Sequence, residues 1–245
     1  MNADAMKNLF VGTSGFAFKE WKGPFYPKDL PDARMLDYYA ERLGSVEINN
    51  TFYRMPKVSV LQDWAARVPA AFRFVLKASR QITHMTRLKE AQPVEYLLKN
   101  SAALEEKRGP LLFQLPPNMK KDVERLKTFL SWIPAEVRAA LEFRHASWHD
   151  EEVFAALRAR NAALCVSQVD GDEEGALNTP FIATADWSYL RLRKQGYEPG
   201  ELEEWAARIR QPAWGDVFVF FKHEDEGTGP KLAKRFEEIV AGSAT

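Results

Sequence analysis

Eight short apolar runs recur along the chain, and segments with helical periodicity separate most of them. The runs are Leu9–Thr13, Val46–Asn49, Phe72–Lys77, Leu111–Leu115, Ala140–Arg144, Ala163–Gln168, Ser188–Arg193 and Asp216–Lys222. Between them, apolar residues spaced like Val123, Leu126 and Leu130 predict amphipathic helices. Strands that alternate with helices eight times within 245 residues favour an α/β fold of the closed TIM-like (β/α) barrel type over an open doubly wound sheet.

One repeat departs from this pattern. The stretch between Gln168 and Ser188 is rich in Asp, Glu and Gly and shows no convincing amphipathic periodicity. We therefore expect an irregular or missing sixth helix. No linker or low-complexity tract interrupts the rest, so residues 1–245 are predicted to form a single barrel domain.

Several of the predicted strands end in polar or charged residues. Side chains alternate between the two faces of a strand, so Glu47 cannot share the face of Val46 and Ile48. The same parity separates Glu142 from its apolar neighbours and Arg191 from the leucines beside it. The carboxyl ends of barrel strands meet at one pole, where active sites lie. The residues expected there are Glu47, Lys77, Gln114, Glu142, Arg144, Arg191 and Lys222.

This set contains four cations and two carboxylates, so the mouth of the barrel should be positive. We expect a pocket for an anionic group, phosphate or carboxylate, with Arg144 or Arg191 offering bidentate donors. The alternative is that these charges pair among themselves as structural salt bridges.

Three of these residues are candidates for catalysis. Glu47 and Glu142 lie near an excess of cations and are candidate general acid and base, if their pKa values are pushed apart. Lys77, desolvated beside other cations, is a candidate base or Schiff-base nucleophile. Alternatively, Lys77 only neutralises Glu47.

The loops after the second, third and fifth strands carry further candidates for ligand binding. Tyr53 and Arg54 are expected to overhang the mouth, and His84 and Trp148 follow the next strand ends. Trp148 has the alternative role of capping the barrel as packing. The predicted binding residues are Asn49, Tyr53, Arg54, His84, Gln114, Arg144, Trp148, Arg191 and Lys222.

The overall charge limits the possible partners. Lys plus Arg and Asp plus Glu each total 34, so the chain lacks the basic field of a general nucleic-acid binder, although a local basic site is compatible with this balance. No run of eighteen apolar residues and no long apolar segment at the N-terminus occurs, and we expect a soluble cytoplasmic protein without membrane association. The single cysteine, Cys165, is expected to be a small core residue.

No metal and no cofactor are predicted. Glu47, Glu142, Asp170 and His223 are chemically adequate ligands near strand ends, but the four histidines form no HxH or HExxH spacing. Gly12-Thr-Ser-Gly15 is a short turn that matches neither the P-loop nor the dinucleotide fingerprint.

Several motifs, in order, resemble the YecE-like family (domain of unknown function seventy-two). They are Val11-Gly-Thr-Ser-Gly-Phe16, Trp21-Lys-Gly-Pro-Phe-Tyr-Pro27, Val46-Glu-Ile-Asn-Asn-Thr-Phe-Tyr-Arg54, Phe74-Val-Leu-Lys-Ala-Ser-Arg80, Gly109-Pro-Leu-Leu-Phe-Gln-Leu-Pro-Pro117 and Glu142-Phe-Arg-His-Ala-Ser-Trp148. The resemblance spans the chain from Val11 to about Lys234. It implies a barrel fold and brings no assigned reaction.

The sequence departs from the family pattern in two places. Arg193 stands where the family usually has a histidine after the seventh strand, and Lys222-His-Glu224 replaces a usual Asn-Asn-Asp after the eighth. Both changes affect residues of the mouth, so a different or more anionic ligand is expected here.

The leading hypothesis is an enzyme of hydrolase, lyase or isomerase type that acts on a small anionic substrate by acid–base chemistry. An alternative resembles the xylose-isomerase-like barrels that include apurinic endonucleases, with nucleic-acid phosphate held over the mouth. A further alternative is a metabolite-binding module without catalysis. The sequence leaves the oligomeric state open.

Overall fold

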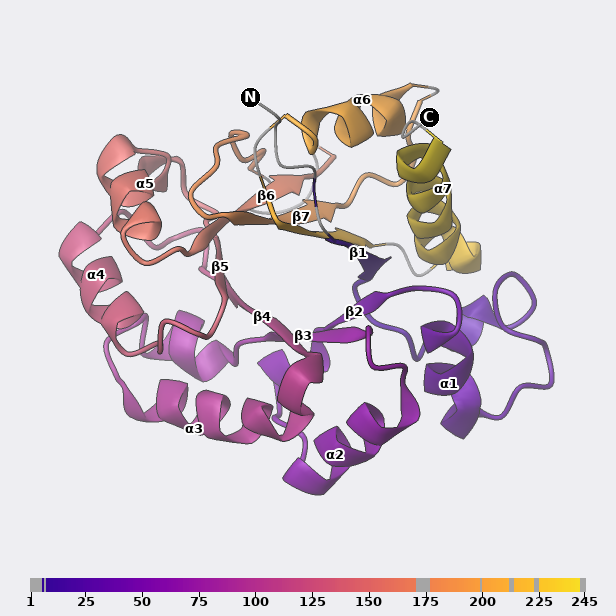
Figure 1. Cartoon of the computed structure of the whole chain (residues 1–245). Helices are drawn as coiled ribbons and strands as arrows, with labels where there is room; N and C mark the ends of the chain where they lie inside the picture. Colours follow the sequence, from indigo (N-terminus) through magenta and orange to yellow (C-terminus); the bar gives the residue numbers. More distant parts are fainter. Residues whose placement is uncertain are drawn as a thin grey trace.

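Eight parallel strands close into a barrel in chain order, with β8 paired to β1 (Figure 1). The computed structural model describes residues 6, 8–170, 177–198, 200–211, 214–222 and 225–242. The strands are β1 (Asn8–Thr13), β2 (Ser45–Ile48), β3 (Arg73–Lys77), β4 (Arg108–Gln114), β5 (Ala139–Glu142), β6 (Ala163–Gln168), β7 (Trp187–Leu192) and β8 (Asp216–Phe221). The predicted TIM-like barrel is therefore confirmed.

Helices surround the barrel (Figure 1). They are α1 (Met35–Ala40), α2 (Val58–Arg67), α3 (Gln92–Ser101), α4 (Val123–Ser131), α5 (Glu151–Arg158), α6 (Glu201–Arg208) and α7 (Thr228–Gly242). Between β6 and β7, the described residues 169–170 and 177–186 contain no helix, as expected for the sixth repeat. Residues 171–176, on which part of that expectation falls, lie outside the described residues.

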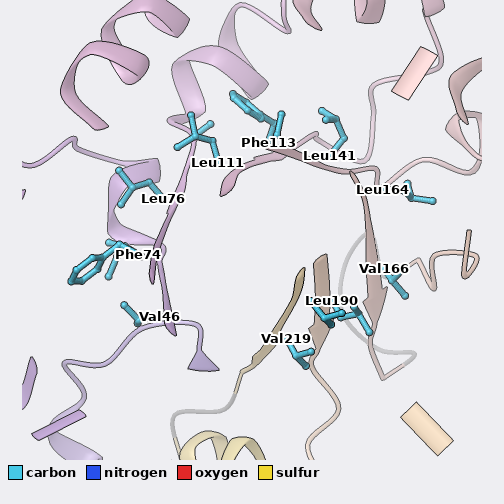
Figure 2. Packing of buried hydrophobic residues seen from close by; sticks show 14 of the residues in the cluster. Val46, Phe74, Leu76, Leu111, Phe113, Leu141, Leu164, Val166, Leu190 and Val219 are labelled. Atoms are coloured by element: carbon cyan, nitrogen blue, oxygen red, sulfur yellow. The ribbon is translucent and has the colours of Figure 1, made fainter. Parts of the chain in front are cut away.

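The two faces of the strands bury different sets of side chains. Phe74 and Leu76 lie on the outer face of the ring of strands, where the helices cover them (Figure 2). Val75, between them, has the opposite parity and belongs to a second buried cluster inside the barrel. Cys165 is part of this inner cluster and fully buried, which confirms it as a core residue.

The inner face changes from apolar to polar toward the carboxyl ends of the strands. Lys77 follows Val75 on the same face, and Gln114 follows Leu112. Three further polar residues lie two positions after a member of the inner cluster and therefore share its face of the strand. They are Glu142 after Ala140, Ser167 after Cys165, and Arg191 after Tyr189. The barrel interior is thus an apolar plug with a polar layer on top, as side-chain layers in such barrels allow.

Gly12 permits the close approach of β1 to β2 beneath this polar layer. A Cβ atom at Gly12 would lie 1.8 Å from the carbonyl oxygen of Ser45 and 3.0 Å from the hydroxyl of Tyr39. That hydroxyl donates to the Ser45 carbonyl (2.9 Å) and accepts from the Thr13 amide (2.8 Å). Tyr39 thereby joins the two strands where they carry Ser14 and Glu47 to the mouth.

Gly12→Ala should lower the free energy of unfolding by more than about 3 kcal/mol, because backbone atoms of β2 occupy the space of the new methyl group. Gly44→Ala is the matched control. A Cβ at Gly44 meets nothing within 4 Å, and its effect should stay within about 0.5 kcal/mol. Denaturant unfolding of both variants measures the difference, and equal losses would contradict this account of the β1–β2 contact.

Candidate functional site

Three buried ionic side chains from different strands meet at the carboxyl end of the barrel. Arg191 of β7 donates from Nη1 to Oε2 of Glu142 (2.6 Å) and from Nη2 to Oε1 of Glu47 (2.8 Å). Exposure is 0% for Glu47, 1% for Glu142 and 3% for Arg191. One guanidinium therefore bridges the two carboxylates, and the convergence predicted from strand parity is confirmed.

Glu47 has four hydrogen-bond donors. Besides Arg191, Tyr189 donates its hydroxyl to Oε2 (2.5 Å), and Ser14 Oγ (2.8 Å) and Asn49 Nδ2 (3.1 Å) donate to Oε1. Burial by itself would raise the pKa of Glu47. The charge of Arg191 and the hydrogen bonds from Tyr189 and Ser14 outweigh it, so the pKa lies below its usual value.

Glu142 is surrounded by cations. Gln114 Nε2 (2.9 Å) and Arg144 Nε (3.2 Å) donate to its Oε1, and Arg193 Nη2 lies 3.6 Å from the same oxygen. Burial opposes ionisation, but the charges of Arg191, Arg193 and Arg144 prevail and lower the pKa of Glu142.

The pKa shifts of Glu47 and Glu142 therefore have the same direction. Both carboxyl groups are ionised at neutral pH, and neither carries a proton to donate. Arg191 stabilises both charges at once, so neither carboxyl has the raised pKa that a general acid needs at neutral pH. The division of acid and base roles between Glu47 and Glu142 stays a prediction.

Lys77 lies at the end of β3, beside this cluster. Its Nζ is 4.4 Å from the centre of the Phe52 ring, and it makes no hydrogen bond or ion pair with the described residues. Arg191, and not Lys77, pairs with Glu47. Burial, followed by the charge of Arg191, lowers the pKa of Lys77 to about 8, while the two carboxylates oppose the shift. Lys77 therefore exchanges its proton close to neutral pH.

His84 follows β3 in the short π-helix η4 (Gln81–Met85). Its Nδ1 is 2.8 Å from Thr83 Oγ1, and its ring meets Phe52 edge-on, with 5.0 Å between ring centres. Burial and then the charges of Lys77, Arg144 and Arg87 lower the pKa of His84. The imidazole is therefore neutral at neutral pH.

A cavity of about 590 Å³ opens above these residues, a size suited to a small molecule. Its described lining contains five cations and no Asp or Glu side chain; the cations are Lys77, Arg144, Arg191, Arg193 and Lys222. Glu47 and Glu142 lie beneath it. Aromatic rings form much of the remaining wall, namely Phe16, Phe18, Phe52, Tyr53 and Trp64.

Most of the predicted binding residues reach this cavity. Those that line it are Asn49, Tyr53, His84, Gln114, Arg144, Arg191 and Lys222. Of the predicted catalytic residues, Lys77 lines it directly, whereas Glu47 and Glu142 support Arg191 from below.

Two predicted binding residues lie elsewhere. Trp148 is fully buried, stacks on Phe143 with 4.7 Å between ring centres, and donates from Nε1 to the carbonyl of Met119 (2.6 Å). Its loop folds as a 3-10 turn that returns the ring to the core, so packing is its role. Arg54 is exposed and does not line the cavity.

Other residues of the site were missed. Tyr189 shares the parity of Arg191 on the seventh strand, which would have placed its side chain inward. Arg193 was expected at the mouth but was not among the predicted binding residues, although it has the same parity. Ser14 directly follows β1 and was a strand-end residue by the same reasoning that selected Glu47.

Among the described residues, no three His, Cys, Asp or Glu side chains are arranged to hold a metal ion. Asp170 instead accepts from the amide of Gln195 (2.8 Å), and His223 lies outside the described residues. In the part of the chain that the structure covers, no helix is both long and apolar enough to cross a bilayer.

The fold and site define an α/β barrel with a buried Glu–Arg–Glu cluster beneath a cationic cavity. The family described as "Protein of unknown function DUF72" matches residues 10–245. The chain belongs to this family, which confirms the resemblance seen in its motifs.

Individual relatives agree with this assignment. The UPF0759 protein YecE of Escherichia coli K12 is 30% identical over 112 residues, which are 45% of this chain and 41% of the relative, so the match spans about two fifths of the relative's length. A DUF72 family protein from Thermotoga maritima MSB8 superimposes with a TM-score of 0.83 at 26% identity, covering 96% of this chain and 99% of the other. A DUF72 family protein from Enterococcus faecalis V583 superimposes with a TM-score of 0.77 at 17% identity, covering 98% of this chain and 99% of the other. This second structure shows the shared fold.

Glu142→Gln should lower the free energy of unfolding at pH 7 by about 3 kcal/mol, because it removes one of the two carboxylates that balance the buried arginine charge. Both carboxyls have folded pKa values below the unfolded value of 4.5. The stability they confer is therefore present above that value and lost as the pH falls toward the folded values. The wild type should lose stability steeply in acid and the variant less steeply.

The exposed Glu95→Gln serves as control in the same denaturation series, and parallel pH curves for wild type and Glu142→Gln would refute the assignment.

Proposed function

We propose that the protein binds a small molecule carrying a phosphate or carboxylate at the mouth of the barrel and exchanges a proton with it through Lys77. The observation that carries this proposal is the separation of charge at the site. All the Lys, Arg, Asp and Glu side chains in the described lining of the cavity are cationic, while the two carboxylates that hold Arg191 lie below it. A bound anion would meet donors without meeting a like charge.

Arg144 and Lys77 are the main donors in this proposal. Arg144 uses Nε on Glu142 (3.2 Å), and its Nη groups make no hydrogen bond with the described residues. A guanidinium edge of this kind suits the oxygens of phosphate or carboxylate. Glu47 and Glu142 act here as positioning residues, because they hold Arg191 in place without lining the cavity.

Lys77 supplies the acid–base step. With a pKa of about 8, it is present in both protonation states near neutral pH. The neutral amine accepts a proton from the substrate or, in a hydrolysis, from the attacking water, and the ammonium returns it to another atom of the substrate or to a leaving group. This sequence fits a hydrolase, lyase or isomerase type of reaction.

Sulfate tests the binding part, because its charge is constant between about pH 6 and pH 10. Its affinity, measured by calorimetry, should fall as the pH rises through about 8, since Lys77 then loses its charge. Lys77→Met should weaken binding at pH 7 about tenfold and remove this pH dependence. Lys99→Met, which changes an exposed lysine of α3 outside the cavity, should behave as wild type. No sulfate binding, or an affinity unchanged through pH 9, would disprove the proposed site.

Lys77→Arg tests the catalytic part once phosphorylated and carboxylated sugars and acids have been screened for turnover. Arginine keeps the positive charge but does not release its proton. The variant should therefore bind a substrate found in the screen and fail to convert it. Full turnover by Lys77→Arg would exclude Lys77 as the acid–base group, and binding without conversion by the wild type would indicate a metabolite-binding module.

A further inference from the structure

A second cavity of about 680 Å³ adjoins the mouth, between the segments that follow β2 and β3. We call it the side groove; Tyr53, Arg80, Met85 and Tyr96 line it, together with the polar residues Ser79, Gln81, Glu90 and Gln92. Tyr53, Met85 and Tyr96 are the three most exposed large hydrophobic side chains of the described chain, at 73%, 63% and 58%. Single exposed apolar residues are ordinary, whereas three around one hollow mark a binding surface.

The backbone beside the groove is unusual. Met85 ends the π-helix η4, and the residues after it include Arg87 and Leu88, with φ of 50° and 63°. Positive φ at two consecutive non-glycine residues is strained, and such strain gathers at ligand sites. Within η4, His84 lines the mouth cavity and Met85 lines the side groove. This one segment therefore shapes both cavities.

An aromatic surface connects the two cavities. Phe52 and Tyr53 line both of them. The centre of the Phe52 ring lies 4.4 Å from Lys77 Nζ, and the ring also meets Tyr53 edge-on, with 5.1 Å between ring centres. If the anionic group of a ligand lies at Lys77, the rest of the ligand can therefore extend along the rings of Phe52 and Tyr53 into the side groove.

The groove combines ring faces with hydrogen-bonding groups. Arg80 makes no ion pair or hydrogen bond with the described residues, and Gln81 and Gln92 are exposed beside it. An alkyl chain would use the rings and leave these polar groups without partners. A planar base uses both, because its face stacks on tyrosine and its edge pairs with amide and guanidinium groups.

We infer that the protein's ligand is a nucleotide, with its phosphate at the mouth and its base in the side groove. The inference rests on the proposed function, since the mouth supplies the phosphate site. Of the two tyrosines, Tyr96 distinguishes the cavities, because it lines the groove and not the mouth, whereas Tyr53 lines both.

Calorimetric titration with inorganic phosphate, ribose 5-phosphate and the four ribonucleoside monophosphates tests the inference. At least one nucleotide should bind about tenfold more tightly than ribose 5-phosphate, in keeping with the usual strength of base stacking. Tyr96→Ala should weaken that nucleotide about tenfold and leave ribose 5-phosphate within about twofold, while Tyr96→Phe keeps the nucleotide affinity. Val60→Ala, an exposed apolar change outside both cavities, is the control.

The outcomes separate the two proposals. If phosphate and ribose 5-phosphate bind but no nucleotide binds more tightly, the nucleotide assignment falls and the anion site stands. A nucleotide gain that Tyr96→Ala leaves unchanged also overturns the assignment, because the base then lies elsewhere. If no phosphorylated probe binds, the proposed function itself fails.

Discussion

The fork of Arg191 between Glu47 and Glu142 is the interaction on which the mouth of this barrel depends. Two carboxylates inside a low-dielectric barrel are costly unless each has a cation and enough hydrogen-bond donors. A planar guanidinium meets both carboxylates with separate Nη groups, at 2.8 and 2.6 Å. The three residues come from β2, β5 and β7, so the ion pairs require those strands to hold a common register around the closed sheet.

Stability alone does not account for this buried Glu–Arg–Glu cluster, because apolar side chains of similar total volume often give a fold of equal stability. Its effect on the cavity above it is more informative. The carboxylates engage Arg191 and Arg144 from below, and cationic side chains remain at the cavity surface. The charge of Arg191 is also a main cause of the lowered pKa of Lys77, second only to burial. The same arginine thus anchors the site and tunes the lysine proposed to act in it.

Strand parity predicted much of this arrangement, because an alternation of two residues decides which side chains face the interior. The alternation predicts that Glu47, Glu142 and Arg191 lie together, and the eightfold repeat predicts the barrel. Parity did not predict the pKa of the carboxyls, which depends on how many donors reach each oxygen. Strand parity also does not predict where the side chains of the loop residues after each strand lie. Trp148 returns to the core and Arg54 remains exposed, because a turn after the strand end follows its own hydrogen bonds and packing.

Loops and strand ends contribute different chemistry to the cavity. Its cations come from the ends of β3, β5, β7 and β8 and the residues directly after them, whereas its rings come from the segments after β1 and β2 and from α2. A ligand would therefore bind with its charge toward one side and its apolar part toward the other. Arg193 and Lys222, the positions at which the motifs predict a departure from the family pattern, both line the cavity on the cationic side. Substitution of Lys222 would change how much negative charge a ligand can carry, whereas substitution of Arg193 would also remove a charge that lies 3.6 Å from Oε1 of Glu142.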